Sequence, residues 1–133
     1  MDDERLKEIF GSTKTVASVG LSNTPGRASK GVCRYLQEAG YRIIPVNPNE
    51  TEVLGETSYP DLKSIPEKID LVQIFRNPEA VPAIVEDAIA IGAKAVWMQD
   101  GAGNPEAAAR AEEAGLVAIV DDCMLRQHAR LFS

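Results

Sequence analysis

The feature that most constrains the fold is a glycine that ends a helical segment and is followed at once by an apolar run. This pattern occurs three times, at Gly40–Tyr41, Gly92–Ala93 and Gly115–Leu116. A glycine in this position can adopt the left-handed conformation that commonly ends a helix. The residues that follow it begin a short strand-like segment, so helices and strands alternate. Such alternation is typical of βαβ units, in which neighbouring strands are parallel.

The apolar periodicity predicts five strands and five helices. We expect strands at residues 15–20, 41–46, 70–75, 93–98 and 116–120. We expect helices at residues 2–10, 29–39, 78–91, 105–114 and 124–132. The connection 49–68 contains glycine and prolines, and it is expected to hold only a short helical turn near 61–65. Ser29 is expected to cap the second helix, because a serine hydroxyl can accept a hydrogen bond from a free helical N–H.

These elements predict an α/β fold with a doubly wound, mainly parallel sheet. Residues 16–19, 43–46 and 71–75 are almost continuously apolar, as expected when helices cover both faces of the sheet. The expected architecture is therefore three-layered and Rossmann-like. The chain has 133 residues, a length that predicts a single domain over 1–133.

Composition excludes several classes of function. With 14 Lys and Arg against 20 Asp and Glu, the net charge is −6, so a basic footprint for nucleic acid or a membrane surface is absent. No apolar run approaches the roughly 20 residues of a membrane span, and no secretory leader is apparent. Two cysteines and one histidine do not suffice for a disulfide framework or a zinc site. We expect a cytoplasmic protein, a monomer or small homo-oligomer, with its protein partner left open.

Doubly wound sheets bind ligands at the carboxyl ends of their strands. The loops expected at this edge are all polar or rich in glycine and proline, namely residues 20–29, 47–49, 75–78, 99–103 and 121–123. The first of them lacks the G-x-G-x-x-G spacing of dinucleotide-binding proteins. It nevertheless suits a phosphate, because it leads into a helix N-terminus and carries Ser22, Asn23 and Ser29 as donors and Arg27 as a phosphate-binding fork. A plain turn with a capping serine is the alternative.

The end of the second strand argues against NAD. NAD-binding chains carry an acid there that bonds the ribose hydroxyls. Here the strand ends in Val46-Asn47-Pro48, and no acid occurs before Glu50. The sequence therefore favours a nucleotide whose ribose carries a phosphate, which a carboxylate would repel.

Several motifs in this order and register carry a family resemblance. They include Val19-Gly20-Leu21-Ser22, Val46-Asn47-Pro48, Phe75-Arg76-x-Pro78-Glu79 and Asp121-x-Cys123-Met124. The chain resembles, over nearly its whole length, the small bacterial and archaeal CoA-binding proteins. These in turn resemble the N-terminal CoA-binding domain of the succinyl-CoA synthetase α subunit.

The resemblance implies four groups of contacts with coenzyme A. The pyrophosphate would be held by Gly20, Ser22 and the segment Arg27–Ser29. The adenosine would be bordered by Val46, Asn47 and Pro48. The nucleotide and pantetheine path would be lined by Phe75, Arg76 and Pro78, and Gln99 would face the pantetheine arm.

The chain also departs from the family pattern. Many relatives have a lysine, a natural partner for the 3′-phosphate, where this chain has Asn49, and an aromatic residue where it has Lys30. Lys30 or Arg42 is the candidate to replace that lysine. Near the C-terminus, Leu125 and Gln127 stand in place of a more usual lysine and glutamate.

Few residues are candidates for chemistry. Cys123 follows the last strand and could form a mixed disulfide with the CoA thiol or sense oxidants, with a small buried apolar role as the alternative. Cys33, Trp97 and Met98 are expected in the core. His128 is expected at the surface or a helix end, and the Asp121–Asp122 pair in a turn or cap.

Since the only histidine has no evident partner, no nucleophile–base set is predicted. The expected function is non-catalytic binding of coenzyme A or acyl-CoA. The alternatives are a CoA-linked enzyme and an NAD-responsive regulatory domain. The enzyme would be either a redox protein that forms a CoA mixed disulfide at Cys123 or a degenerate acyl-CoA ligase subunit.

Overall fold

The computed structural model describes residues 1–132, and its centre is a parallel sheet of five strands. These strands are β1 (Thr15–Val19), β2 (Arg42–Val46), β5 (Leu71–Ile74), β6 (Ala95–Met98) and β7 (Val117–Ile119). Their order in the sheet is β2-β1-β5-β6-β7. The chain runs from β1 outward to β2 and then returns past β1 to β5, so the strand order reverses between β1 and β5. In doubly wound folds this reversal marks the ligand-binding crevice.

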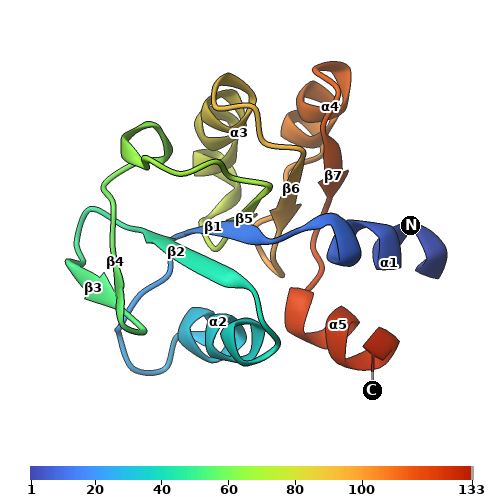
Figure 1. Cartoon of the computed structure of the whole chain (residues 1–133). Helices are drawn as coiled ribbons and strands as arrows, with labels where there is room; N and C mark the ends of the chain where they lie inside the picture. Colours follow the sequence, from blue (N-terminus) through green and yellow to red (C-terminus); the bar gives the residue numbers. More distant parts are fainter. Residues whose placement is uncertain (133) are drawn as a thin grey trace.

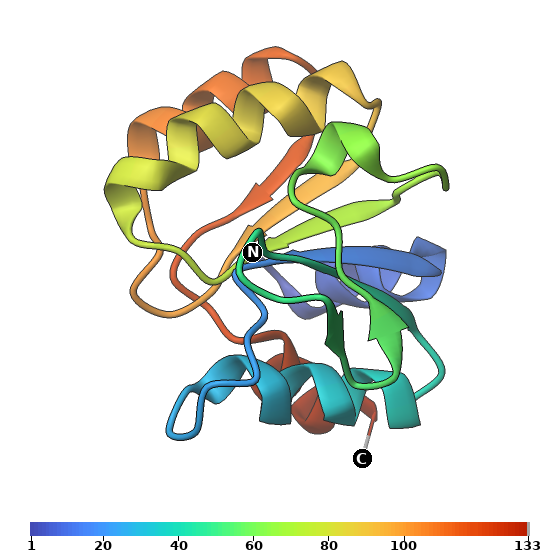
Figure 2. The same ribbon diagram turned by 90° about the vertical axis from the view of Figure 1, so that its left-hand side faces the viewer.

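Helices cover both faces of the sheet (Figures 1 and 2). The five α-helices are α1 (Asp3–Ser12), α2 (Ala28–Glu38), α3 (Val81–Ala90), α4 (Pro105–Glu113) and α5 (Met124–Phe132). Helices α3 and α4 pack side by side on one face, and α2 and α5 lie on the other, where α1 contacts α5. The predicted three-layer, Rossmann-like α/β fold is confirmed.

Each face of the sheet buries its own apolar core. On the α3/α4 side, strand residues such as Val72 and Val96 pack against Val85 and Ala111. On the other side, Trp97 packs with residues from α1, α2 and α5, among them Phe10, Leu36 and Met124. Because every central strand is covered twice, its side chains are apolar on both faces, which explains the continuous apolar runs of the sequence. The predicted core positions Cys33, Trp97 and Met98 are all fully buried.

The element boundaries agree with the expected ranges to within a few residues, with two differences. The connection 49–68 holds, besides the expected turn Leu62–Ser64, an antiparallel pair that was not predicted, β3 (Glu52–Val53) and β4 (Glu56–Thr57). Pro78 begins a separate 3-10 turn, Pro78–Ala80, and α3 starts only at Val81. Two-residue strands are too short to show a period in the sequence.

A buried polar ladder crosses the sheet and joins its layers. The Ser18 hydroxyl donates to Gln73 Oε1 at 2.8 Å, and Gln73 Nε2 donates to Gln99 Oε1 at 3.2 Å. Gln99 Oε1 also accepts the Met124 N–H at 3.0 Å, so the start of α5 is tied to the end of β6. All polar side-chain atoms buried within residues 1–132 have a partner, and the ladder accounts for the amides in the core.

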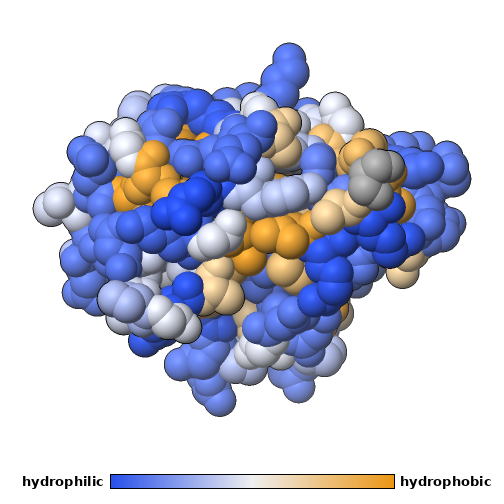
Figure 3. All heavy atoms as spheres, turned by 90° about the horizontal axis from the view of Figure 1, so that it is seen from below, coloured by the Kyte–Doolittle hydropathy of each residue, from blue (hydrophilic) through white to orange (hydrophobic). Residues whose placement is uncertain are grey.

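The surface beside α2 and α5 is mainly hydrophilic, with apolar residues gathered in a strip near its centre (Figure 3). Phe132 at the end of α5 is half exposed. The two ends of the described chain are joined by an ion pair in which Arg130 Nη2 lies 2.8 Å from Asp3 Oδ1. The longest helix in residues 1–132 has 11 residues, and none is long and apolar enough to cross a bilayer.

His128 has a different environment from the one expected. Its Nδ1 lies 2.8 Å from the Tyr35 hydroxyl, and its ring packs against Phe10, Tyr41 and Phe132, with centroids at 5.3, 5.7 and 4.7 Å. The expectation of a surface or helix-end histidine is therefore wrong. Residues from α1, α2 and α5 meet at this ring. Because Phe10 and His128 are 118 positions apart in the sequence, no local pattern indicates this cluster.

Replacing His128 by glutamine is expected to flatten the pH dependence of stability. Burial lowers the pKa of His128 from its ordinary value of 6.5, so the folded protein favours the neutral ring. The stabilisation is therefore fully present above the unfolded-state pKa, and it is lost as the pH falls through the lower folded-state pKa. Urea titrations between about pH 5 and about pH 8 measure the free energy of unfolding across the range where histidine titrates.

The matched control is Val85→Ala, which removes apolar contacts from the core on the opposite face of the sheet and leaves the rings around His128 in place. It is expected to be less stable at every pH and to retain the wild-type slope. Equal slopes in wild type and His128→Gln would contradict the assignment of this slope to His128.

Candidate functional site

A cleft of about 580 Å³ opens where the strand order reverses. It is lined from the loops after β1, β2 and β5, which contribute Gly20, Ser22, Thr24, Arg27, Val46, Asn47, Pro48, Asn49, Glu50, Phe75, Arg76 and Asn77. A smaller hollow of about 270 Å³ adjoins it at Gly20, Arg27 and Arg76 and continues to Ser29, Asp100 and Gly101. The carboxyl ends of the central strands thus form one continuous depression, where the sequence predicted a ligand.

A further hollow, of about 520 Å³, lies at the opposite edge of the sheet. It is lined by residues at the amino ends of β6 and β7, such as Ala95 and Val117, and by the end of α1. None of the predicted ligand-contacting residues borders it. The predicted ligand-contacting residues therefore have no part in it.

Gly20 allows β1 and β5 to end close together. Its φ is +94°, and a Cβ atom there would lie 2.7 Å from the Phe75 carbonyl oxygen. Its N–H donates to Val46 O at 2.9 Å, while the Phe75 N–H donates to Val19 O at 2.8 Å. A side chain at position 20 would therefore push apart the two loops that line the floor of the cleft.

The N-terminus of α2 faces this depression without a side-chain cap. Arg27 is the residue before the first turn, and no side chain accepts the free N–H groups there. The expected capping role of Ser29 is wrong, because Ser29 lies inside the first turn, where its hydroxyl accepts the Ser22 N–H at 3.2 Å. Free amides and the positive end of the helix dipole are therefore available to an anion beside Arg27.

Two arginines without ion-pair partners border the same depression. Within residues 1–132, five of the eight arginines form ion pairs, and the three that do not are Arg27, Arg34 and Arg76. Arg27 and Arg76 are exposed and line both the cleft and the adjoining hollow. Guanidinium groups suit the oxygens of a phosphate. Together with the α2 amides, they form a positive region in a protein of net charge −6.

The cleft also contains one carboxylate. Glu50 Oε2 accepts the Asn23 N–H at 2.8 Å and the Ser22 hydroxyl at 3.2 Å, and Glu50 Oε1 accepts Asn23 Nδ2–H at 3.1 Å. These bonds, the one from the Asn23 backbone first, lower the pKa of Glu50. Glu50, the first acid after β2, therefore lies in the cleft, which the end of the strand did not indicate. The β3–β4 pair follows Glu50 directly, and Asn23 Nδ2 reaches it as well, donating to Glu52 O at 2.8 Å.

The end of β2 is fastened to the loop after β1. Asn47 Nδ2 donates to Leu21 O at 3.2 Å, and Asn47 Oδ1 accepts the Asn49 N–H at 2.9 Å. Val46 and Pro48 add apolar surface to the cleft, and both also border a small hollow of about 130 Å³. Asn47 therefore shapes the rim, and its neighbours supply an apolar wall.

Arg42 cannot take the place of the missing family lysine at Asn49. It is the first residue of β2, whereas the cleft lies at the last one, and its guanidinium pairs with Glu56 at 2.8 Å and Glu67 at 2.6 Å. The hydrogen bonds that Arg42 donates to these two carboxylates, Glu67 first, raise the pKa of Arg42. Lys30 lies close enough to lower the pKa of Glu50, but it does not line the cleft.

Four predicted contact residues lie outside the cleft lining. Asn23 directs its donors to Glu50 and Glu52, and Gln99 is buried in the polar ladder. The Pro78 carbonyl accepts Asn104 Nδ2–H at 2.9 Å, and Cys123 is half buried against the core on the α2 side. The other nine, Gly20, Ser22, Arg27, Ser29, Val46, Asn47, Pro48, Phe75 and Arg76, are brought together. Thr24, Glu50, Asn77 and Asp100 were missed.

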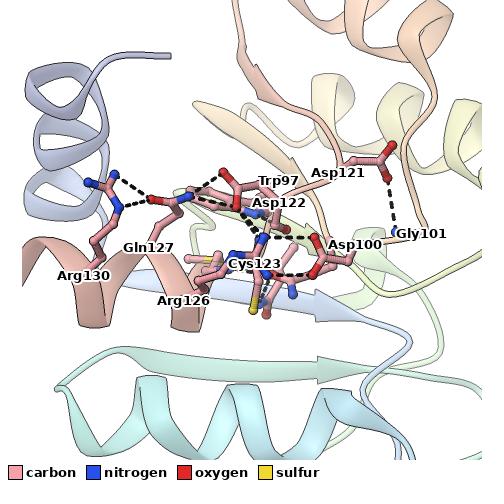
Figure 4. Close-up of polar contacts among 12 residues, drawn as sticks. Trp97, Asp100, Gly101, Asp121, Asp122, Cys123, Arg126, Gln127 and Arg130 are labelled. Atoms are coloured by element: carbon pink, nitrogen blue, oxygen red, sulfur yellow. Dashed lines mark hydrogen bonds and ion pairs between the residues drawn. The ribbon is translucent and has the colours of Figure 1, made fainter.

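The acids after β7 have structural roles (Figure 4). Asp121, with φ +50°, accepts the Gly101 and Gly103 N–H groups at 3.2 and 2.8 Å. Asp122 accepts the Cys123 N–H at 2.8 Å and pairs with Arg126, which also bonds Asp100. The doublet thus fixes the loop after β6 and the segment before α5, whereas neither carboxylate accepts a backbone N–H of α5 among the hydrogen bonds of residues 1–132. Within residues 1–132, no group of three His, Cys, Asp or Glu side chains is placed to hold a metal.

Comparison with known families decides the relationship. Residues 14–129 match the model of a family described as the CoA binding domain. The chain belongs to this CoA-binding domain family. The matched range includes the whole cleft and the five strands.

Relatives of two kinds share this domain. The uncharacterized protein YneT of Bacillus subtilis is 41% identical over 124 residues, which are 93% of this chain and 92% of YneT. The ADP-forming acetate–CoA ligase II of Archaeoglobus fulgidus is 31% identical over 91 residues, which are 67% of this chain but only 13% of the ligase. A hypothetical protein from Pyrococcus horikoshii has a solved structure with a TM-score of 0.97 and 44% identity, covering 100% of this chain and 94% of its own. The CoA-binding domain therefore occurs both alone and within much longer ligases.

Replacing Gly20 by alanine is expected to destabilise the protein more than replacing Gly26, the matched control. Both glycines have positive φ, +94° and +84°, but a Cβ at Gly26 meets no atom within 4 Å. Gly26→Ala should therefore cost only the backbone strain, roughly 1–2 kcal/mol. Gly20→Ala should cost roughly 1–3 kcal/mol more, because its Cβ meets backbone. Urea denaturation of both variants measures the difference, and equal losses would show that the approach to Phe75 imposes no constraint.

Proposed function

We propose that this CoA-binding-domain protein binds coenzyme A or acyl-CoA in the cleft at the carboxyl ends of β1, β2 and β5, and that it acts by binding rather than by catalysis. The observation that carries the proposal is a pair of arginines, Arg27 and Arg76, that form no ion pair within residues 1–132 and lie beside the uncapped N-terminus of α2. A pyrophosphate carries two negative charges and needs donors from more than one direction. The helix amides and the two guanidinium groups provide them.

The shape of the depression supports a ligand with two dissimilar ends. Towards β2, Val46 and Pro48 offer an apolar wall for an adenine ring. In the other direction the adjoining hollow runs past Gly20 to Gly101, and it would take the start of the pantetheine arm. The pyrophosphate between the two ends would then lie at Arg27 and Arg76. This division matches the contacts that the family resemblance implies.

The residues around the cleft do not favour a reaction. Among the residues that the structure describes, no histidine lines it, and Cys123 is absent from its lining. The other cysteine, Cys33, is fully buried, and burial raises its thiol pKa to about 12, so it stays protonated and is a poor nucleophile. Without a nucleophile and a base within reach of each other, the side chains support recognition of the ligand.

Calorimetric titration of the protein with CoA tests this proposal. Arg27→Ala and Arg76→Ala are each expected to weaken binding about tenfold or more, since each removes a charge-assisted hydrogen bond to a phosphate. Arg34→Ala is the matched control, because Arg34 is likewise exposed and unpaired but does not line the cleft. Its affinity should equal that of the wild type. Absence of a CoA isotherm for the wild type, or equal losses in all three variants, would refute the proposal.

A further inference from the structure

Glu50 occupies a specific place in the cleft, between the loop after β1 and the end of β2. The residue is partly exposed, and its carboxylate is held by three hydrogen bonds from Ser22 and Asn23. Two of them reach Oε2 and only one reaches Oε1. Each carboxylate oxygen can accept two hydrogen bonds, so Oε1 retains an acceptor position. The group is therefore fixed in the cleft with a capacity to accept one more donor.

The charges of the cleft are segregated. The cations Arg27 and Arg76 lie where the α2 N-terminus and β5 meet, whereas Glu50 lies on the β2 side. Asp100 also borders the adjoining hollow, but its carboxylate is paired with Arg126. No lysine or arginine lines the cleft on the β2 side, because Asn49 is neutral and Arg42 lies at the opposite edge of the sheet. Lys30 is the cation near Glu50, and it remains outside the lining. The β2 side is thus suited to hydroxyl groups and unsuited to a phosphate.

In doubly wound folds the ribose of a bound adenosine lies over the end of the second strand, and its hydroxyls bond to an acid there. We propose that Glu50 accepts a hydrogen bond from a free ribose hydroxyl, and that the cleft prefers CoA-type ligands whose ribose carries no 3′-phosphate, such as dephospho-CoA. This inference rests on the proposed function. A 3′-phosphate on this ribose would place a negatively charged group beside the Glu50 carboxylate, and like charges repel.

Titration of the wild-type protein with CoA and with dephospho-CoA tests the inference, since the two ligands differ only in the 3′-phosphate. Dephospho-CoA is expected to bind about tenfold more tightly at low salt, and the ratio should shrink as salt screens the repulsion. This comparison needs no variant, so it does not depend on the folding of one.

A variant then assigns the preference to Glu50. Glu50→Gln keeps an oxygen for the Asn23 N–H and the Ser22 hydroxyl, loses the bond from Asn23 Nδ2, and removes the charge. It is expected to bring the two affinities to within about twofold, mainly by improving CoA binding. Glu38→Gln, at the far end of α2, makes the same change of charge outside the cleft and should preserve the wild-type ratio. Thermal unfolding of both variants checks that they are folded.

Each outcome decides one of the two proposals. If CoA binds as tightly as dephospho-CoA or more tightly, the inference is overturned while the proposed function stands. If CoA binds more tightly than dephospho-CoA to the wild type but not to Lys30→Met, the inference is also overturned, because Lys30 then binds the 3′-phosphate. If neither ligand binds, the proposed function itself fails. A dephospho-CoA preference that survives in Glu50→Gln would overturn the role of Glu50.

Discussion

The parallel pairing of β1 with both β2 and β5 is the constraint on which the rest of the structure depends. Val19 is in register with Val46 on one side and Ile74 on the other, so three strands end at the same level. The next residues of each strand therefore emerge at one point. The chain then leaves β1 for α2 on one face and β5 for α3 on the other, which opens the cleft between them. Gly20 keeps this junction closed at its base, because any side chain would meet the Phe75 carbonyl.

Local placement of charge outweighs the net charge of the protein. The chain carries −6 overall, yet most of its arginines are neutralised by neighbouring carboxylates, as Arg42 is by Glu56 and Glu67. At physiological ionic strength exposed charges act over about 8 Å, so distant acids contribute little at the cleft. Arg27 and Arg76, with no carboxylate partner among residues 1–132, dominate one part of it. Glu50 dominates the other part, so the site has a positive part and a negative part.

Much of the candidate site could be predicted because it follows from strand ends. Gly20, Val46 and Phe75 each end a strand or come directly after one, and the strand boundaries are evident in the sequence. Parallel strands bring such residues together. Glu50 was misjudged because its carboxylate reaches the loop after β1, a contact between residues 27 positions apart that no local pattern encodes. Gln99 was misjudged because a polar residue at a strand end can form hydrogen bonds with buried partners inside the sheet instead of facing a ligand.

The sequence by itself determined the fold class, because helix-ending glycines and continuously apolar strands are local signals that only a doubly wound parallel sheet satisfies together. It also determined which edge carries the polar loops. The tertiary structure alone decided which side chains are available to a ligand: Arg27 and Arg76 remain free whereas Arg42 is paired, and Glu50 lies in the cleft whereas His128 lies in an aromatic cluster. Those outcomes depend on hydrogen bonds and packing between residues far apart in the chain, and periodicity carries no information about such contacts.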